Sequence, residues 1–600
     1  MTKIRVADYI ANFIYDSLKV KDIFLVTGGG AMFLNDSIAL HGKINPILNH
    51  HEQASAMGAV AYSKYKNSFA CAMVTSGCGG TNTVTGVLDA WQDNTPVFFL
   101  SGQVKKKETV YNTTLPLRQY GVQEGNIVAI VKSITKYSIM VNEPLEIAYH
   151  LEKAQYLAKS GRPGPVWIDV PLDVQGATID VDHLKHFDSK ELELNYKTDS
   201  TENEIASVIA DLKEAKRPII LAGNGIRLSD SVEDFKNFCR LYNLPVTTSY
   251  LGIDLLNTSS KLFVGRLGIK GDRAGNFALQ NADYILVLGS RLSVALTGFE
   301  YKLFAREAKV TVVDIDTNEH LKNTVKIDNF INADVKNFLT KMNSIIPVET
   351  DNEWVNKCEN WKKIWPVYLK KYESEENINK YTFIDYMCKY LNDDTTVVSD
   401  AGSAYYVTAQ SLRIEKNQRF ITSGAQADMG FTLPASIGVA VASKKDVVAI
   451  TGDGSFQMNI QELQTIVQHQ FPIKIFVWNN NGYLSIRTTQ RKFFEGREMG
   501  TDTNSGISFP NLEKIANAYG IKYYIAKKVE DLHEVLSQVM KEKVPVICEI
   551  INPENQEIIP TVASMKKEDG SMVSKPIEDM YPFLDRDEFK TQMIISPLED

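Results

Sequence analysis

The feature that most constrains this fold is a repeated alternation of short apolar segments with helix-like stretches. The apolar segments end in glycine or another small or polar residue, as in "DIFLVTGGG" near the start, "ADYILVLGSR" in the middle and "DVVAITGDG" towards the end. Alternating strands and helices imply parallel sheets that are covered by helices on both faces. Because the texture occurs in three separate blocks, we predict an α/β protein with three doubly wound parallel-sheet domains.

Two polar, charged stretches, at about 182–203 and 348–376, separate the blocks and are typical of linkers. A chain of 600 residues is too long for a single core, because domains usually hold about 100–200 residues. The tail after the third block is charged, and we expect it to be extended, either covering another part of the chain or lying as a surface arm. The expected units are residues 1–185, 190–345 and 375–553, followed by the tail 554–600.

Composition and charge exclude several classes of protein. The chain has 65 basic and 73 acidic residues, a formal charge of −8, whereas a nucleic-acid surface needs a clustered basic excess. Six scattered cysteines form no CxxC pair and are typical of free thiols in a reducing compartment. The first residues predict an amphipathic helix, and no apolar run is long enough to span a membrane. We therefore expect a cytoplasmic protein that binds neither nucleic acid nor membrane.

Polar groups follow two of the apolar segments in the third block. The segment ending at Thr451 is followed by Gly452, Asp453, Gly454 and Ser455, and the next one runs into "NNNG", which contains Asn480 and Gly482. Ligands of parallel sheets bind outside the carboxyl ends of the strands, where glycines let the backbone approach and helix N-termini favour phosphate.

Either of these stretches alone would more often be a simple turn. Asp453 and Asn480, however, are separated by the length of one helix and one strand, so adjacent parallel strands would place them side by side. Carboxylate, amide and carbonyl oxygens suit a small octahedral cation that bridges to phosphate. The pair therefore predicts a Mg²⁺ site made by Asp453, Asn480 and the carbonyl of Gly482.

This pair resembles the signature of thiamine-diphosphate enzymes, GDG followed by NN at this distance. A second segment, "NHHEQASAMGAVAYSKYKN", is similar to the corresponding segment of acetolactate synthases, and further stretches agree in collinear order over most of residues 1–553. The resemblance implies pyrimidine-binding, central dinucleotide-type and diphosphate-binding domains in that order. It also implies decarboxylation of pyruvate and transfer of the two-carbon unit to an acceptor carbonyl.

The resemblance assigns roles to individual residues. Glu52 matches the glutamate that hydrogen-bonds the aminopyrimidine ring, and Met429 matches the apolar residue that wedges beneath the bent cofactor. Gln123 stands where the family holds a substrate-side glutamine, and Lys136 is kept as well, although a lone lysine is more often a solvated charge. Glycines and a serine would meet the cofactor's diphosphate: Gly402, Ser403, Gly452, Gly454 and Ser455.

Two parts of the chain depart from the synthase pattern. Where synthases read GQHQ, this chain has "AGSAYYV", so that Ser403 offers one hydrogen bond where a Gln-His pair would give two. Thr489 stands where synthases carry a tryptophan, and Ala295 where they carry an arginine. Loss of the arginine removes a partner for an acceptor carboxylate, and loss of the tryptophan widens the acceptor site. They favour a larger acceptor such as a keto-sugar nucleotide, and the tail resembles that sugar-branching group.

Other interpretations remain open at this stage. Synthases bind FAD, and Gly223, Arg291 and Asp314 match its turns, although relatives use this domain empty or for ADP. The alternatives to a sugar acceptor are an acetolactate synthase with a 2-keto acid acceptor and a simple 2-keto acid decarboxylase; a non-enzymatic homologue would require loss of the cofactor residues, which are present. Family members place Glu52 and Asp453 on different subunits. A homodimer or homotetramer is therefore implied, but the two sites could also face each other within one chain.

Overall fold

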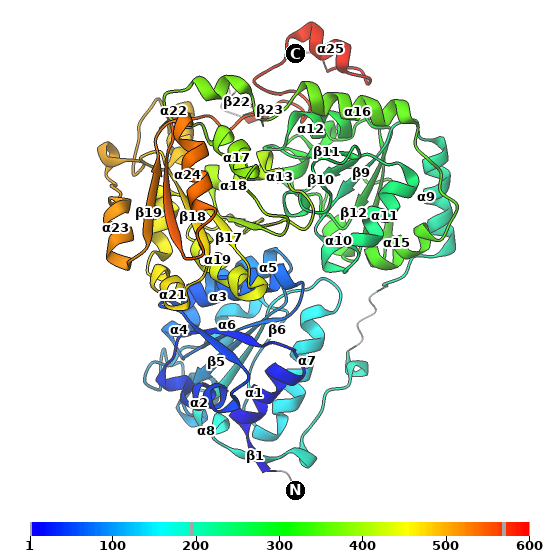
Figure 1. The fold of residues 1–600 in the computed structure, drawn as a ribbon. Helices are drawn as coiled ribbons and strands as arrows, with labels where there is room; N and C mark the ends of the chain where they lie inside the picture. The colour runs from blue at the N-terminus through cyan, green and yellow to red at the C-terminus, as the bar shows by residue number, and fades with distance from the viewer. Residues whose placement is uncertain (1–2, 193–196, 567–571, 599–600) are drawn as a thin grey trace.

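Three parallel sheets of six strands each form the framework of the chain. The computed structural model describes residues 3–192, 197–566 and 572–598. Its three sheets lie in separate units, with the N-terminal unit below the other two in the first view (Figure 1). The predicted fold class is confirmed. The strands of each sheet fall within one of the expected units, whose boundaries stay predictions.

The N-terminal sheet has the strand order β3-β2-β4-β5-β7-β6. Helix α1 of this unit is the amphipathic helix expected near the N-terminus, and it buries one face against the sheet. A short antiparallel pair, β1 with β8, ties the start of the unit to its end. The elements are β1 (Lys3–Arg5), α1 (Val6–Asp16), β2 (Asp22–Leu25), α2 (Met32–His41), β3 (Asn45–Leu48), α3 (Glu52–Lys66), β4 (Ala70–Val74), α4 (Cys78–Thr81), α5 (Val84–Gln92), β5 (Val97–Gln103), α6 (Ile127–Val131), β6 (Tyr137–Met140), α7 (Ile147–Lys159), β7 (Val166–Pro171), α8 (Leu172–Gln175) and β8 (Thr178–Asp180).

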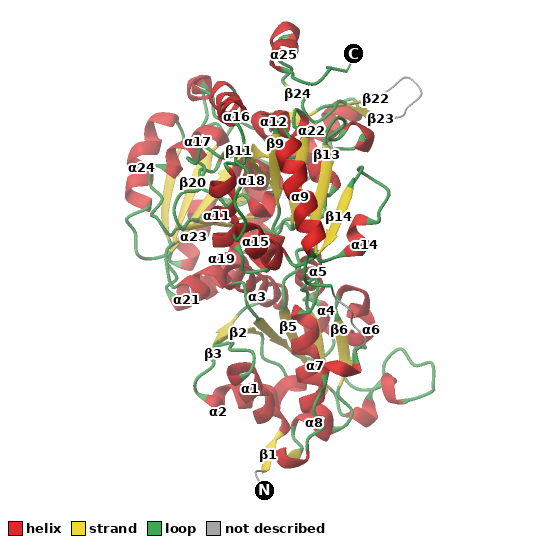
Figure 2. Cartoon of the chain, turned by 90° about the vertical axis from the view of Figure 1, so that its right-hand side faces the viewer, coloured by secondary structure: helices red, strands yellow, loops and turns green. Residues whose placement is uncertain are grey.

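The central sheet has the order β11-β10-β9-β12-β13-β14, which is the strand order of dinucleotide-binding folds. The order reverses between β9 and β12, so a crevice opens at the carboxyl ends of these two strands. Figure 2 shows helices on both sides of the strands. The elements are α9 (Glu202–Glu214), β9 (Pro218–Ala222), α10 (Gly225–Leu228), α11 (Val232–Tyr242), β10 (Val246–Thr248), β11 (Phe263–Arg266), α12 (Arg273–Gln280), β12 (Tyr284–Leu288), α13 (Val294–Thr297), β13 (Lys309–Asp314), α14 (Thr317–His320), β14 (Asn329–Asn332) and α15 (Val335–Asn343).

The C-terminal sheet, β16-β15-β17-β18-β20-β19, repeats the topology of the N-terminal sheet. Its strand order reverses between β15 and β17, and the carboxyl ends of these strands therefore form the expected ligand edge. The elements are α17 (Lys380–Cys388), β15 (Thr396–Ser399), α18 (Gly402–Ser411), β16 (Arg419–Ile421), α19 (Thr432–Ser443), β17 (Val447–Gly452), α20 (Asp453–Phe456), α21 (Glu462–His469), β18 (Ile473–Asn479), α22 (Leu484–Phe493), α23 (Leu512–Tyr519), β19 (Lys522–Ala526), α24 (Leu532–Val539) and β20 (Val546–Ile551).

Helices α3 and α19 cross at a contact that joins the first unit to the third. A side chain at Gly438 would lie 2.1 Å from the carbonyl oxygen of Gly58, so only a glycine fits there. Glycine inside a helix costs about 0.5–1 kcal/mol relative to alanine. The close approach of the two backbones accounts for these glycines, and it fixes how the N-terminal and C-terminal units meet.

The stretch expected to be a second linker, 348–376, is largely structured. Helix α16 (Asn352–Ile364) lies within it and buries Trp354 and Trp361, because its apolar residues recur at helical spacing among the charges. The interpretation of 348–376 as a plain linker is therefore wrong, since its aromatic residues belong to the core.

The C-terminal tail runs from the third unit back over the central one (Figure 1). Asn276 donates a hydrogen bond to the carbonyl of Ile577, and Trp361 donates to Gln592 of the last helix. The tail thus covers part of the central unit and is more than a free surface arm. Its elements are β21 (Thr561–Val562), β22 (Ser564–Lys566), β23 (Met572–Ser574), β24 (Met580–Tyr581) and α25 (Arg586–Gln592).

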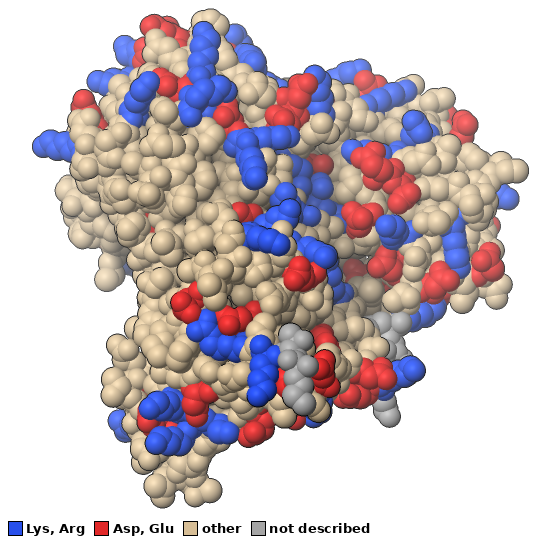
Figure 3. Space-filling model, turned by 60° about the horizontal axis from the view of Figure 1, so that its bottom comes forward, with Lys and Arg blue, Asp and Glu red and all other residues tan. Residues whose placement is uncertain are grey.

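Charges of both signs are spread over the face shown in Figure 3, with a run of Lys and Arg crossing its middle. The excess of acidic residues is therefore not gathered on this face. Among the described residues, no helix has both the length and the apolar character that crossing a membrane requires.

Candidate functional site

The predicted metal residues meet at the carboxyl edge of the C-terminal sheet. Asp453 follows β17, and Asn480 follows the neighbouring parallel strand β18, so the pair lies side by side. The backbone N–H groups of Asn480 and Gly482 donate to Asp453 Oδ2 at 3.2 and 3.0 Å, and the amide of Asn480 donates to the Gly482 carbonyl at 2.7 Å. Carboxylate, amide and carbonyl thus lie within reach of one another, as the spacing of the two motifs predicted. Their role as metal ligands stays a prediction.

Asp453 is a buried carboxylate, only 3% exposed. Burial raises the pKa of the Asp453 carboxyl to about 6, although the N–H groups of Gly482 and Gly454 oppose the shift. A cation beside Asp453 would stabilise its ionised form, because burying an unpaired charge is costly. This environment suits a bound cation.

Gly402 and Ser403 begin helix α18 at the same sheet edge. Gly402 has a φ of +56°, a conformation that side chains other than glycine rarely adopt. A side chain at Gly402 would lie 3.3 Å from Ser485 Oγ, next to the loop of Gly482. The start of α18 therefore faces the Asp453 cluster across the point where the strand order reverses. Backbone N–H groups and a hydroxyl there offer donors to an anion.

The glycines around Asp453 differ in their surroundings. A side chain at Gly454 would lie 2.0 Å from the ring of Tyr483, whereas Gly452 has no atom within 4 Å of that position. Gly452 therefore leaves open space beside the cluster. Ser455 donates to buried Asp400 at 2.6 Å and accepts from the backbone N–H of Gly430 at 2.7 Å. The Ser455 hydroxyl thus connects Asp400 with the backbone of Gly430 next to the Asp453 cluster.

Glu52 begins helix α3 of the N-terminal unit and is half-buried. Its carboxylate accepts one hydrogen bond, from Asn82 at 2.9 Å, and lies beside the turn that contains Gly79. That turn follows β4, so Glu52 sits at the carboxyl edge of the N-terminal sheet. The rest of the carboxylate is free to accept a ligand's hydrogen bond.

Two hydrogen bonds of Asn459 connect the chain neighbours of Glu52 and Met429. Asn459, six residues after Asp453, donates to Gln53 at 3.1 Å and to the carbonyl of Gly430 at 2.9 Å. Gln53 follows Glu52, and Gly430 follows half-buried Met429. The edge of the N-terminal sheet thus meets the C-terminal unit of the same chain. Among the described residues, Glu52 makes no hydrogen bond with Asp453, Asn480 or Met429.

Gln123 lies on an exposed loop beside the same turn as Glu52. Its φ is +62°, and a side chain at Gly77 would lie 2.3 Å from its carbonyl oxygen. Gln103 holds the loop from below by donating to the carbonyl of Gly125 at 2.9 Å. Gln123 is therefore near the turn on which Glu52 rests, with its side chain turned to the outside.

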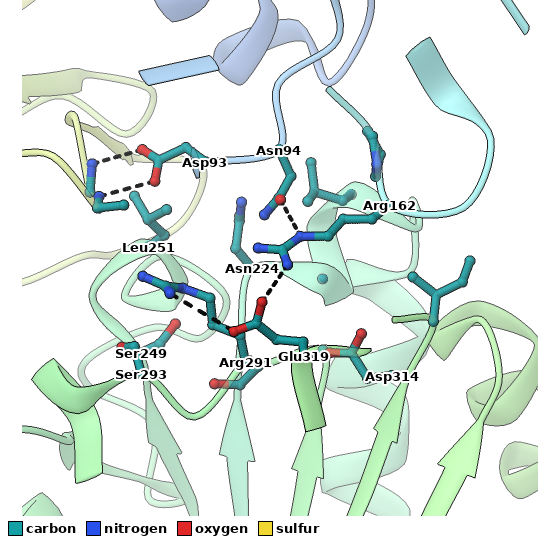
Figure 4. A pocket seen from close by; sticks show the side chains of 18 of the residues that line it. Asp93, Asn94, Arg162, Asn224, Ser249, Leu251, Arg291, Ser293, Asp314 and Glu319 are labelled. Atoms are coloured by element: carbon teal, nitrogen blue, oxygen red, sulfur yellow. Dashed lines mark hydrogen bonds and ion pairs between the residues drawn. The ribbon is translucent and has the colours of Figure 1, made fainter. Parts of the chain in front are cut away.

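A cavity opens in the central unit at the crevice between β9 and β12 (Figure 4). It lies where the three units meet, because Asn94, Arg162 and Ala425 line it together with residues of the central sheet. Arg162 bonds to Glu319 at 2.6 Å and to Asp316 at 3.1 Å, and Arg291 lies 4.0 Å from Glu319. The charges of this cavity are therefore largely paired with one another.

The predicted dinucleotide residues lie around this cavity in different ways. Arg291 and Asp314 line it, whereas a side chain at Gly223 would lie 2.1 Å from the carbonyl oxygen of Gly289. Gly223 thus packs against the end of β12 and allows the two strands to approach. Lys136, predicted only as a retained lysine, donates to the carbonyls of Ser160 and Arg162 and so holds the loop from which Arg162 enters the cavity.

The two residues at which the chain departs from the synthase pattern lie on different units. Ala295, on α13, lines the central cavity, and its carbonyl accepts a hydrogen bond from Ile269 at 2.9 Å. Thr489, on α22, is exposed and donates to the carbonyl of Ser485 within its own helix. Neither side chain fills the space that a tryptophan or an arginine would take.

Three buried charged residues of the site were missed by the sequence analysis. Asp400 accepts from Ser455 and Thr451, and Glu462 accepts from Asn49 at 2.9 Å and from the backbone of His50 at 3.0 Å, just before Glu52. Lys380 is fully buried near Asp453. The only available signal was a charged residue within or beside an apolar stretch, and that signal is too common to single them out.

Three domain families match the chain in order. They are described as the N-terminal TPP binding domain, the central domain and the C-terminal TPP binding domain of thiamine pyrophosphate enzymes, and they match residues 4–130, 205–342 and 400–550. Each match falls on one of the three sheets and includes most of its strands.

Full-length relatives align over nearly the whole chain. The acetolactate synthase large subunit of Lactococcus lactis subsp. lactis is 33% identical over 91% of this chain and 92% of that protein. The mitochondrial acetolactate synthase of Schizosaccharomyces pombe is 31% identical over 91% of this chain and 83% of its own length. A chloroplastic acetolactate synthase of Nicotiana tabacum is 30% identical over 91% and 81%.

Proposed function

The chain belongs to the thiamine pyrophosphate enzyme family, and we propose that it decarboxylates pyruvate and transfers the two-carbon unit to an acceptor carbonyl. The observation that carries the proposal is the convergence of Asp453, Asn480 and the Gly482 carbonyl at the edge of one sheet. Glu52 stands at the corresponding edge of another sheet. The names of the relatives support carboligation, because each is an acetolactate synthase.

The residues of the C-terminal edge fit Mg²⁺ and the diphosphate of thiamine diphosphate, which is the same molecule as thiamine pyrophosphate. Asp453, the amide oxygen of Asn480 and the Gly482 carbonyl would hold the cation, which prefers oxygen ligands. The start of α18, with Gly402 and Ser403, would meet the diphosphate, and Gly452, Gly454 and Ser455 would border it. Asp453 is buried, and burial raises the pKa of its carboxyl to about 6; a bound cation would favour the ionised form and offset this shift.

Thiamine diphosphate, when bound, supplies a nucleophilic ring carbon that attacks the pyruvate carbonyl and accepts the electrons released as CO₂ leaves. Glu52 would share a proton with the aminopyrimidine ring, and Asn82 fixes the position of its carboxylate. Met429 would support the bent cofactor from below, on a segment held by the bond between Gly430 and Ser455. Gln123 matches the family's substrate-side glutamine; its side chain is exposed on the loop beside Gly77 and would have to turn inward to face the substrate.

The acceptor is decided around Ala295 and Thr489. The small side chains at these positions favour an acceptor larger than a 2-keto acid, such as a keto-sugar nucleotide, whereas the names of the relatives favour a second 2-keto acid. Protonation in place of transfer would make the chain a simple decarboxylase. Incubating the enzyme with pyruvate and either class of acceptor, and following the products by mass, separates the three outcomes.

We also propose that the central cavity binds FAD. It lies at the reversal point of a sheet with the dinucleotide-binding strand order, and Arg162 and Arg291 could meet a pyrophosphate while Asp314 meets a ribose hydroxyl. A yellow protein with flavin absorbance supports this assignment, and a colourless protein that binds no added FAD contradicts it.

The assembly proposed is a homodimer or homotetramer, since family members complete each site with two subunits. Sedimentation measures the assembly. A monomer with full activity would contradict this part of the proposal and leave the chemistry standing.

Replacing Glu52 with Gln tests the function itself. The variant should lose about hundredfold or more of the pyruvate turnover, because the ring loses its carboxylate partner, yet calorimetry should show nearly unchanged binding of Mg²⁺ and thiamine diphosphate. Glu143→Gln, an exposed glutamate paired with Lys106, is the matched control. Full turnover by the Glu52 variant would refute the assigned chemistry.

A further inference from the structure

Lys380 is a buried cation without a hydrogen-bond partner beside the metal cluster. It is 0% exposed, and its Nζ has no partner among the described residues. Lysine is almost never fully buried unless it is paired, because removing an ammonium from water is costly. A lysine in this position therefore indicates that an anion belongs nearby.

The segment just before Lys380 is held at the ends of β18 and β20. Ile378 N–H donates to the Ile551 carbonyl at 3.0 Å, and Asn552 N–H donates to the Asn479 carbonyl at 2.9 Å. Asn552 also donates its side-chain amide to the carbonyl of Ile378 at 2.7 Å. Lys380 thus begins α17 next to the strand end that presents Asn480.

Burial lowers the pKa of Lys380 to about 7, and three charged side chains modify this shift. Asp453 and Glu375 favour the charged form and Arg487 disfavours it; Asp453 is the buried anion of the cluster. Arg487 is itself only 1% exposed and has its own partners: it donates to the carbonyls of Asn481 and Glu554 and lies 3.5 Å from Asp502. Lys380 therefore has Asp453 as its main counter-charge within the fold.

A cation on Asp453 would change this balance. The proposed metal takes over the Asp453 carboxylate, and the diphosphate that it bridges brings more negative charge than the metal neutralises. Lys380 then remains as the buried positive charge without an anion of its own.

We propose that Lys380 is a further positioning residue of the cofactor site, whose buried ammonium balances the diphosphate held against Asp453. The inference rests on the proposed function and concerns how this chain anchors the cofactor. Arg487 holds the Asn480–Gly482 loop beside it by donating to the carbonyl of Asn481.

The test compares cofactor binding by the apo protein and three variants. Lys380→Met removes the charge and keeps the length, Lys380→Arg keeps the charge, and Lys474→Met is the matched control. Lys474 is also fully buried, but it lies at the opposite end of β18 and pairs with Asp446 at 3.3 Å. Calorimetric titration with thiamine diphosphate and Mg²⁺ gives the affinity, and competition by inorganic pyrophosphate isolates the diphosphate part.

We expect Lys380→Met to weaken binding of both ligands by about tenfold to hundredfold, the contribution of a hydrogen bond to a charged group. Lys380→Arg should keep most of the affinity, and Lys474→Met should bind like the unmodified protein. Thermal unfolding adds a second readout. Without cofactor, Lys380→Met should lose less stability than Lys474→Met, because Lys380 Nζ makes no hydrogen bond among the described residues whereas Lys474 loses its ion pair with Asp446.

Unchanged affinity in Lys380→Met overturns the inference, and so does an equal loss in Lys474→Met. If Lys380→Met does not fold, Lys380→Gln replaces it in the same titrations. An unmodified protein that binds no thiamine diphosphate overturns the proposed function and this inference together. If the unmodified protein binds thiamine diphosphate, but no more tightly than Lys380→Met does, the inference fails and the proposed function stands.

Discussion

The metal cluster of the C-terminal sheet and the cavity of the central sheet occupy equivalent places, but they differ in whether their charged side chains are paired. Both lie where the strand order of a parallel sheet reverses. At the first, Asp453 accepts from the backbone N–H groups of Gly454, Asn480 and Gly482, and Lys380 Nζ makes no hydrogen bond within the described part of the chain. At the second, Arg162 and Glu319 pair across the cavity.

This difference in charge pairing indicates which of the two sites depends on a ligand. A site with uncompensated buried charge is stabilised when an ion binds, whereas a site with paired charges keeps its shape alone and has to break pairs to bind an anion. We therefore expect strong coupling between ligand and stability at the C-terminal edge, and weak coupling in the central cavity.

The largest effect should come from Asp453→Asn. Loss of a buried, hydrogen-bonded charge should weaken Mg²⁺-dependent binding of thiamine diphosphate by about hundredfold or more, as measured by calorimetry. Asp446→Asn, just before the other end of β17, is the control, because Asp446 pairs with Lys474 and Lys543 away from the site. If Asp453→Asn bound thiamine diphosphate as tightly as the unmodified protein, the C-terminal site would not depend on this charge.

Asp254→Asn tests how firmly the two regions are joined. Asp254, in the central unit, pairs with Arg227 at 2.8 Å and with Arg419 of the C-terminal sheet. Burial alone would raise its pKa, but the two arginines lower the pKa of Asp254 to about 2. Breaking this buried network should cost about 3–5 kcal/mol of unfolding free energy near neutral pH.

The sign of the pH dependence follows from the lowered pKa of Asp254. Its contribution is present above its ordinary pKa, near 4, and is lost as the pH falls towards 2. Urea unfolding of both proteins should therefore show a stability difference that shrinks over this range. A difference that stays constant down to pH 2 would show that the ion pairs do not cause it.

Ser403→Ala should have a smaller effect on the cofactor. A single neutral hydrogen bond contributes about 0.5–1.5 kcal/mol, so the affinity for thiamine diphosphate should fall by about two- to tenfold. If the loss in this variant exceeded that in Lys380→Met, the diphosphate would depend on the start of α18 more than on the buried cation.

Glu319→Gln should have the smallest effect, and in the opposite direction. Burial alone would raise the pKa of Glu319, but hydrogen bonds from Lys322 and Arg162 lower this pKa to about 2. The Glu319 carboxylate is therefore charged and competes with any anion for Arg162. Its neutralisation should tighten FAD binding by up to about fivefold, measured by flavin fluorescence. Arg291→Ala is the counterpart and should weaken binding by a similar factor; weaker binding in both variants would mean that Glu319 supports the ligand.

Much of the fold could be predicted because its signals are local. Apolar segments that end in glycine predict strands, and the spacing of Asp453 and Asn480 predicts neighbouring strand ends, as found. Lys380 could not be predicted, because its burial depends on β18 lying beside β20, a pairing that skips β19. Glu462 could not be predicted for a related reason. Its partners Asn49 and His50 come from another unit, and the sequence around Glu462 does not indicate this long-range contact.

The crossing of α3 and α19 has a consequence for chimeric proteins. Because Gly438 leaves no room for a methyl group against Gly58, the first and third units have to match at two positions far apart in the sequence. A hybrid that joins the N-terminal unit of one relative to the C-terminal unit of another should therefore assemble only if both parents keep small residues there. These two glycines are the first positions to compare before such a hybrid is made.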